Sequence, residues 1–118
     1  MIYNKLFAII LPLAVVGCTS SVEDARLNQP SWQGSSSKSM EALSQCIYSG
    51  WSTSRVIAKD DTSHTEMKPG KTTVYTWEES MFVDLTPQGS STDMRFYKTF
   101  EMGETVLADR LSIVQHCR

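Results

Sequence analysis

The chain has 118 residues, of which 41% are hydrophobic and 20% are charged, and its net charge is −2. These values are typical of a globular protein, and the length is enough for one small domain. The 11 basic residues are interspersed with 13 acidic ones, so no basic stretch is available to neutralise phosphates. Nucleic acid is therefore excluded as a partner.

The first 17 residues have the organisation of a secretory signal peptide. A short start with one positive charge, Lys5, precedes an apolar run over residues 6–16 that is interrupted by Pro12. Eleven residues rise about 16 Å as a helix, which is roughly half of the hydrocarbon core of a bilayer. The run is therefore too short for a transmembrane helix and has the length of a signal-peptide core.

The apolar run ends in Val15-Val16-Gly17-Cys18. This sequence resembles the lipobox of bacterial prolipoproteins, with a branched apolar residue at −3, a small residue at −1 and a cysteine at +1. The resemblance implies cleavage between Gly17 and Cys18 and attachment of lipid to the Cys18 thiol. Two or three acyl chains hold a protein permanently at a bilayer. We therefore expect a lipid-anchored protein of the cell envelope.

The residue after the cysteine bears on which membrane holds the protein. In prolipoproteins an aspartate at this position tends to retain the product in the inner membrane, and here the residue is Thr19. The resemblance therefore favours the periplasmic face of the outer membrane.

Residues 18–38 are expected to form a flexible tether that begins with the lipidated cysteine. The segment is rich in serine and threonine, contains Pro30 and Gly34, and has few apolar residues. Such a composition buries too little surface to offset the entropy of ordering. A flexible chain of this length averages roughly 25 Å from end to end. Trp32 is the exception: it can dock on the domain or lie at the membrane interface, and its large aromatic area favours docking.

Residues 39–118 are expected to form a single α+β domain. Apolar residues recur at helical spacing over residues 39–49, with serines 35–37 available as a cap and Gly50 as a natural stop. Strands are expected over residues 55–58, 72–77, 81–85 and 92–100, with turns over residues 68–71 and 87–90. A final helix is predicted by one apolar stripe: Val106, Leu107, Leu111 and Val114.

The order of these elements is helix, about four strands, helix. Elements grouped in this way predict a two-layer sandwich, in which an antiparallel sheet is flanked by an N-terminal and a C-terminal helix. The last strand allows two orientations, with either Met94 and Phe96 or Tyr97 and Thr99 facing inward.

Two cysteines, Cys46 and Cys117, remain once Cys18 is lipidated. In an oxidising compartment an isolated pair forms a disulfide. This bond would close a loop of about 70 residues and contribute about 4 kcal/mol on the chain-entropy model. A metal site or a catalytic thiol pair would require more ligands or a C-x-x-C spacing, and neither occurs.

The chain as a whole resembles small proteobacterial or prophage-borne lipoproteins with one disulfide. The features that carry this resemblance are the lipobox, the serine-rich segment, the cysteine helix followed by Trp51, the strands and the final cysteine. The resemblance implies an architecture, and it implies no site residues.

The best metal candidate lies in residues 60–66, where Asp60, Asp61, His64 and Glu66 supply oxygen and imidazole groups. A polar loop leading into a turn explains the same residues more simply, and the spacing does not match a calcium loop. We therefore expect no metal and no other cofactor.

Catalytic patterns are also missing from the sequence. The segment 49–52, Ser-Gly-Trp-Ser, lacks the second glycine of a nucleophile elbow, and Glu78 and Glu79 are expected in a hairpin turn. His116 adjoins Cys117, whose thiol a disulfide would remove, so it is expected to be a surface histidine at a helix end. The protein is therefore not expected to be an enzyme.

Three aromatic residues suggest binding instead. If Tyr75, Trp77 and Tyr97 share the face of the sheet that the helices leave open, they form a binding platform. The sequence then predicts a membrane-anchored binding module whose partner is an envelope protein or a cell-wall component. Two alternatives remain open at this point: a prophage-type inhibitor or exclusion factor, and a small periplasmic hydrolase.

Overall fold

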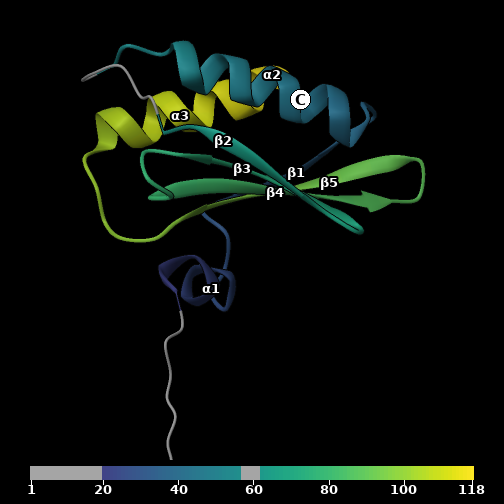
Figure 1. The fold of residues 1–118 in the computed structure, drawn as a ribbon, viewed down its shortest axis with the longest axis horizontal. Coiled ribbons are helices and arrows are strands. Elements are labelled where there is room, and N and C mark those ends of the chain that lie inside the picture. Colours follow the sequence, from purple (N-terminus) through teal and green to yellow (C-terminus); the bar gives the residue numbers. More distant parts are fainter. Residues whose placement is uncertain (1–19, 57–61) are drawn as a thin grey trace, which may run out of the picture.

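The computed structural model describes residues 20–56 and 62–118. Within these ranges three helices and five strands follow one another along the chain (Figure 1). The helices are α1 (Ser21–Arg26), α2 (Met40–Thr53) and α3 (Glu104–Cys117). The strands are β1 (Trp32–Ser36), β2 (His64–Lys68), β3 (Lys71–Thr76), β4 (Met81–Gln88) and β5 (Ser91–Lys98).

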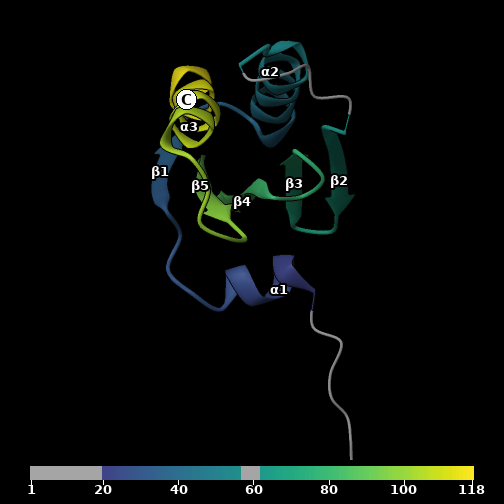
Figure 2. The same cartoon turned by 90° about the vertical axis from the view of Figure 1, so that its left-hand side faces the viewer.

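The strands form one antiparallel sheet in the order β1-β5-β4-β3-β2. Figure 2 shows α2 and α3 side by side on one face of this sheet and α1 alone on the other. The predicted α+β class is confirmed, with five strands instead of about four. None of the helices in the described part of the chain is long and apolar enough to cross a membrane.

Two glycine turns set the register of the sheet. Gly70, between β2 and β3, has φ +77°, and Gly89, between β4 and β5, has φ +62°. Glycine adopts these left-handed conformations at little cost because it has no Cβ. The resulting alternation settles the orientation of β5: Met94 and Phe96 face α2 and α3, whereas Tyr97 faces α1.

Helix α2 is longer than the sequence predicted. Its N-cap is Ser39, whose hydroxyl accepts a hydrogen bond from the backbone N–H of Ala42. The helix does not stop at Gly50 but continues to Thr53, so the predicted stop was wrong. A Cβ at Gly50 would lie 2.5 Å from Cγ2 of Ile113, which indicates that this glycine serves the close approach of α2 to α3.

The main core lies between the sheet and these two helices. Trp51 is its largest side chain: it is fully buried, it donates from Nε1 to the carbonyl of Arg110 at 2.9 Å, and it meets the Phe96 ring edge-on. The other fully buried apolar residues of this core are Leu43, Ile47, Val74, Met81, Val83, Leu85, Met94 and Val114.

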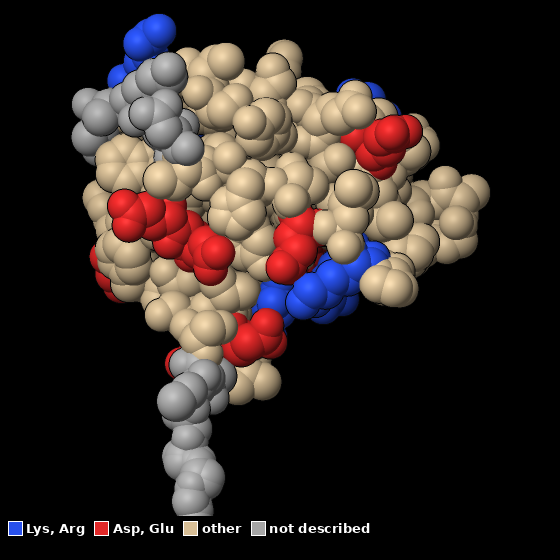
Figure 3. Space-filling model, viewed as in Figure 1, with Lys and Arg blue, Asp and Glu red and all other residues tan. Residues whose placement is uncertain are grey.

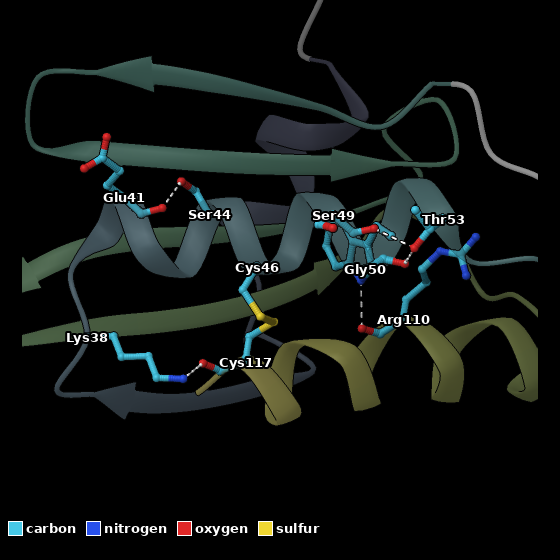
Figure 4. The surroundings of a disulfide bond; sticks show 10 residues. Lys38, Glu41, Ser44, Cys46, Ser49, Gly50, Thr53, Arg110 and Cys117 are labelled. Carbon is cyan, nitrogen blue, oxygen red and sulfur yellow. Dashed lines mark hydrogen bonds between the residues drawn. A yellow bond between two sulfur atoms is a disulfide. The ribbon is translucent and has the colours of Figure 1, made fainter.

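A disulfide joins Cys46 of α2 to Cys117 of α3, as the sequence predicted, with 5.8 Å between the two Cα atoms. Figure 4 shows this bond bridging α2 and α3, on the face of the sheet opposite to α1. Close to it, the ammonium group of Lys38 donates to the Cys117 carbonyl at 2.8 Å. The end of α3 is therefore held by two contacts, one to α2 and one to the segment before α2.

The expected flexible tether is the largest difference from the sequence analysis. Residues 21–26 form α1, and residues 32–36 form β1, which pairs with β5 along its whole length. The composition of this segment supplies little apolar surface, but its main chain satisfies its hydrogen bonds on an existing strand. As expected, Trp32 packs against the main core.

The first of the expected strands, over residues 55–58, also differs from the structure. Residues 55 and 56 are not in a strand, and the rest of the strand expected over 55–58 lies outside the described residues. A strand forms later in the chain, as β2, because residues 64–68 are followed by the predicted turn and can pair with β3.

Candidate functional site

The aromatic residues predicted to form an open platform are not exposed together. Tyr75 and Tyr97 do share the face opposite α2 and α3, on either side of Phe82, but each is only 5% exposed. Helix α1 covers them with Val22 and Ala25. The platform expectation is therefore wrong for these two residues, because the supposed tether folds over it.

Trp77 does not belong to that face. It lies beyond the end of β3, is partly buried and packs against the main core on the helix side of the sheet. Arg110 lies near its ring, with 5.9 Å between the guanidinium carbon and the ring centroid. Trp77 therefore acts as a core residue at the edge of the domain.

An ion pair holds α1 on the aromatic cluster. Arg26 donates from Nε and Nη2 to the two carboxylate oxygens of Asp84 at 2.8 and 2.9 Å, and its guanidinium lies 4.9 Å from the centroid of the Phe82 ring. Thr73 donates to the same carboxylate at 2.7 Å. The hydrogen bonds that Arg26 donates to Asp84 raise the pKa of Arg26 above its usual value. The two-oxygen geometry is the strong form of an arginine–carboxylate contact.

The predicted metal candidates are divided by the structure. Asp60 and Asp61 lie outside the described residues, and His64 and Glu66 are exposed on β2. His64 stacks on Tyr75, with 4.7 Å between ring centroids, and Glu66 accepts a hydrogen bond from the Tyr75 hydroxyl at 3.2 Å. Among residues 20–56 and 62–118, no three potential ligands come together at a metal site.

The turn between β3 and β4 has an unusual backbone. Trp77, Glu78 and Glu79 all have positive φ, at 53°, 53° and 66°. Left-handed conformations cost non-glycine residues about 1–2 kcal/mol each. A hydrogen bond from the Ser80 N–H to the Trp77 carbonyl at 2.9 Å closes the turn, and the Thr62 hydroxyl accepts the Glu78 N–H at 2.7 Å.

This strained turn borders an open depression of about 530 Å³ that also touches the start of α1 and Phe100. Strain of this kind often marks a functional site. The depression is lined by hydroxyl and carboxylate groups, yet no serine donates to a histidine among the described residues; the ring hydrogen bond of His64 goes to the Thr62 carbonyl. Nothing in this arrangement assembles a nucleophile with its base.

The edge of the sheet formed by β2 is more suggestive of function. Among residues 20–56 and 62–118, β2 pairs only with β3, on one side, and all five of its side chains are exposed. An exposed edge presents unpaired N–H and C=O groups that can accept another strand. Extended peptides bind many proteins in this way, with affinity from main-chain hydrogen bonds and specificity from side-chain pockets.

An apolar groove runs beside this edge. Thr65 and Met67 of β2 point to the helix side of the sheet, where they form a depression of about 390 Å³ with α2. Two of its residues are large exposed hydrophobic side chains: Met67, at 81% exposed, and Tyr48, at 42%. A strand added to β2 would place its own side chains in this groove. We define Tyr48, Thr65 and Met67 as the β2 groove.

The opposite edge of the sheet, β1, is protected. Arg118 donates from Nε to the Ser35 carbonyl at 2.8 Å, and its guanidinium lies 6.0 Å from the centroid of the Trp32 ring. The end of α3, which the disulfide fixes in place, therefore covers part of β1. In the part of the chain that the structure describes, the two edges of the sheet therefore differ, and β2 is the open one.

His116 is exposed in the last turn of α3, as expected, beside the disulfide. The depression of about 540 Å³ at this place is lined by the two bonded cysteines and by small or apolar residues such as Gly50 and Ile113. With both sulfur atoms in the disulfide, His116 has no thiol to activate.

A buried arginine was missed by the sequence analysis. Arg110 is fully buried; it donates from Nε to Thr76 at 3.1 Å and from Nη1 to Ser54 at 3.0 Å, and it forms an ion pair with Asp109. It therefore joins the end of α2, α3 and the end of β3. The signal was present in the sequence, because Arg110 lies one helical turn from both Val106 and Val114.

No protein-family model, no curated protein and no solved structure matches this chain significantly. Gly17 and Cys18, the predicted cleavage and lipidation site, lie outside the described residues. The function is therefore inferred from the sequence motif, the disulfide and the surfaces described above.

Proposed function

We propose that the mature protein is a lipoprotein of the cell envelope, held at the membrane by lipid on Cys18. The lipobox supports this proposal, and so does the fate of the cysteines. The chain has three cysteines, and two of them are joined in the disulfide. Cys18 is thus the one cysteine left for modification, and a disulfide-bonded domain suits an oxidising compartment outside the cytoplasm.

Mass spectrometry of the protein from its native membrane tests the anchor. The expected product begins at Cys18 and carries the mass of its acyl chains. The Cys18→Ser variant should lose this mass and the membrane association, whereas the matched Thr19→Ala variant should keep both. A product that retains Met1, or one in which the Cys18 thiol is unmodified, would refute the anchor. Separation of the two membranes tests the expected outer-membrane location.

For the anchored domain we propose binding without catalysis, with the open edge of β2 receiving an extended segment of an envelope protein. The observation that carries this proposal is the conjunction of an unpaired edge with the β2 groove beside it. Backbone pairing would supply affinity, and side chains of the partner would enter between Tyr48 and Met67. Such a partner need not be folded before it binds.

The proposal can be tested with edge-blocking variants. A lysine on an edge strand opposes strand addition, because pairing would bury its charge. Met67→Lys should reduce capture of an envelope partner at least tenfold, and Tyr48→Ala should weaken it less. Gln115→Lys places the same charge on the exposed surface of α3 and should have no effect. Captured complexes should also protect the backbone amides of β2 from hydrogen exchange.

A captured partner does not by itself support the proposal. If capture is equal for Met67→Lys and Gln115→Lys, or if the protected amides lie on another element, the edge of β2 is not the binding site.

A further inference from the structure

The structure leaves little chain between the anchor position and the folded domain. Ser20 is the N-cap of α1, accepting a hydrogen bond from the Glu23 N–H at 3.1 Å. Two peptide units separate Cys18 from Ser20, and consecutive Cα atoms are 3.8 Å apart, so the two Cα atoms lie within about 8 Å. The lipid would therefore be attached almost directly to the domain.

Helix α1 cannot act as a loose extension of this short link. Val22 and Ala25 are buried on the sheet, and Arg26 is bound to Asp84 through both carboxylate oxygens. The start of α1 consequently moves with the sheet. A lipid on Cys18 then brings the α1 side of the domain towards the bilayer and turns α2 and α3 away from it (Figure 2).

Two large apolar side chains are exposed on the α1 side. Leu27, at the end of α1, is 82% exposed. Phe100, which follows β5, is 59% exposed and borders both depressions that flank α1, one at its start and one at its end. Exposed apolar side chains beside a membrane anchor are expected to enter the interface between headgroups and acyl chains.

We propose that the α1 side of the domain rests on the lipid bilayer and that Leu27 and Phe100 contact it. We define this surface by α1 and Phe100 and call it the membrane face. The proposal rests on the anchor at Cys18 proposed above, and it specifies the orientation that such an anchor imposes. The occupant of the membrane face is thus a lipid surface rather than a second protein.

The charge of the membrane face shows whether anionic lipids attract it. The exposed acidic residues at or near the membrane face, Glu23, Asp24, Glu78, Glu79 and Glu101, outnumber the basic ones. In Figure 3 acidic side chains lie on both sides of a basic group on the side of the molecule in view. Attraction to anionic headgroups therefore does not drive the contact. The contact is driven by the short link to the lipid and by the two apolar side chains.

Quenching by lipid tests the contact in the full lipidated protein. The probe is a Phe100→Trp variant in phosphatidylcholine vesicles whose acyl chains are brominated near the headgroup. We expect its emission to be quenched several-fold more, above the wild-type tryptophan background, than that of a Gln115→Trp variant, whose probe lies on α3. An insertion of twelve glycine and serine residues between Thr19 and Ser20 should remove most of this difference.

The possible outcomes separate the two proposals. If the protein does not float with the vesicles, the anchor proposal fails. If the Phe100→Trp variant floats but is quenched by aqueous acrylamide and not by brominated lipid, the membrane face is in solvent and this inference is overturned. If neither quencher acts, another protein copy covers the face, and this too overturns it. Full quenching that persists with the spacer would show that the short link does not impose the contact.

Discussion

The two faces of the sheet are held by different means. On one face, two helices of fourteen residues bury a continuous apolar core and are joined by a disulfide. On the other, a helix of six residues covers three aromatic rings and is fixed by one ion pair. Regions with less buried apolar area open locally at lower free energy. The α1 side should therefore open before the α2–α3 side.

Loss of the disulfide should have the largest effect. The bond closes 71 residues of sequence separation, which corresponds to about 4 kcal/mol of stability on the chain-entropy model. The Cys46→Ala/Cys117→Ala variant should lose this amount in urea unfolding, with a lower midpoint. Reduction of the wild-type protein provides the control and should reproduce the loss. A loss below about 1 kcal/mol would mean that packing alone holds α2 to α3.

Removal of the α1 ion pair should have a smaller and more local effect. Arg26→Ala leaves the buried Asp84 carboxylate without its charged partner, which we expect to cost about 2 kcal/mol. Hydrogen exchange should show faster exchange of the α1 amides, while α2 and α3 stay protected.

An exposed ion pair provides the control for this variant. Arg95 pairs with Asp93, but its side chain is 49% exposed. Arg95→Ala should therefore change stability much less than Arg26→Ala does. Equal effects of Arg26→Ala and Arg95→Ala, or equal deprotection of all three helices, would contradict the difference between the two faces.

The contrast between the faces also explains what the sequence could predict. Periodicity identified the helix face, because Leu43, Ile47, Val106 and Val114 repeat at the spacing of buried stripes, and cysteine counting identified the disulfide. These signals depend on the local spacing of residues or on the number of cysteines, so they can be read without knowledge of the fold. The α+β class followed from the order of such elements.

The α1 side could not be predicted in the same way. Its segment has the composition of a linker, and its order depends on contacts that are distant in sequence, such as Arg26 with Asp84 and β1 with β5. Both contacts require the sheet to exist first. The binding platform at Tyr75 and Tyr97 failed for this reason. The β2 groove was missed because residues 60–66 were assigned to a polar loop and residues 68–71 to a turn, so that no strand was expected between them.

The third prediction concerns the close packing of α2 against α3 at Gly50. Gly50→Val introduces side-chain atoms where Ile113 already lies, because even a Cβ would be 2.5 Å from Ile113 Cγ2. Overpacking of this kind costs about 1–3 kcal/mol, and we expect the lower end because Ile113 is only partly buried. Ser49→Val, at an exposed neighbouring position of the same helix, should lower the stability by about a few tenths of a kcal/mol at most. A neutral Gly50→Val variant would mean that α3 can move away freely.

The smallest expected effect concerns alkaline pH and again separates the faces. Burial raises the pKa of Tyr75 above its usual value of 10. Below pH 10 the phenol is neutral in both the folded and the unfolded chain, so the stabilisation is fully present. As the pH rises beyond 10, the unfolded chain ionises first, and stability is lost until the folded-state pKa is reached. The urea midpoint should therefore fall less between pH 9 and 10.5 for Tyr75→Phe than for the wild type. Tyr48→Phe, which removes an exposed phenol from the other side of the sheet, should follow the wild type; if it behaves like Tyr75→Phe, burial under α1 is not the cause.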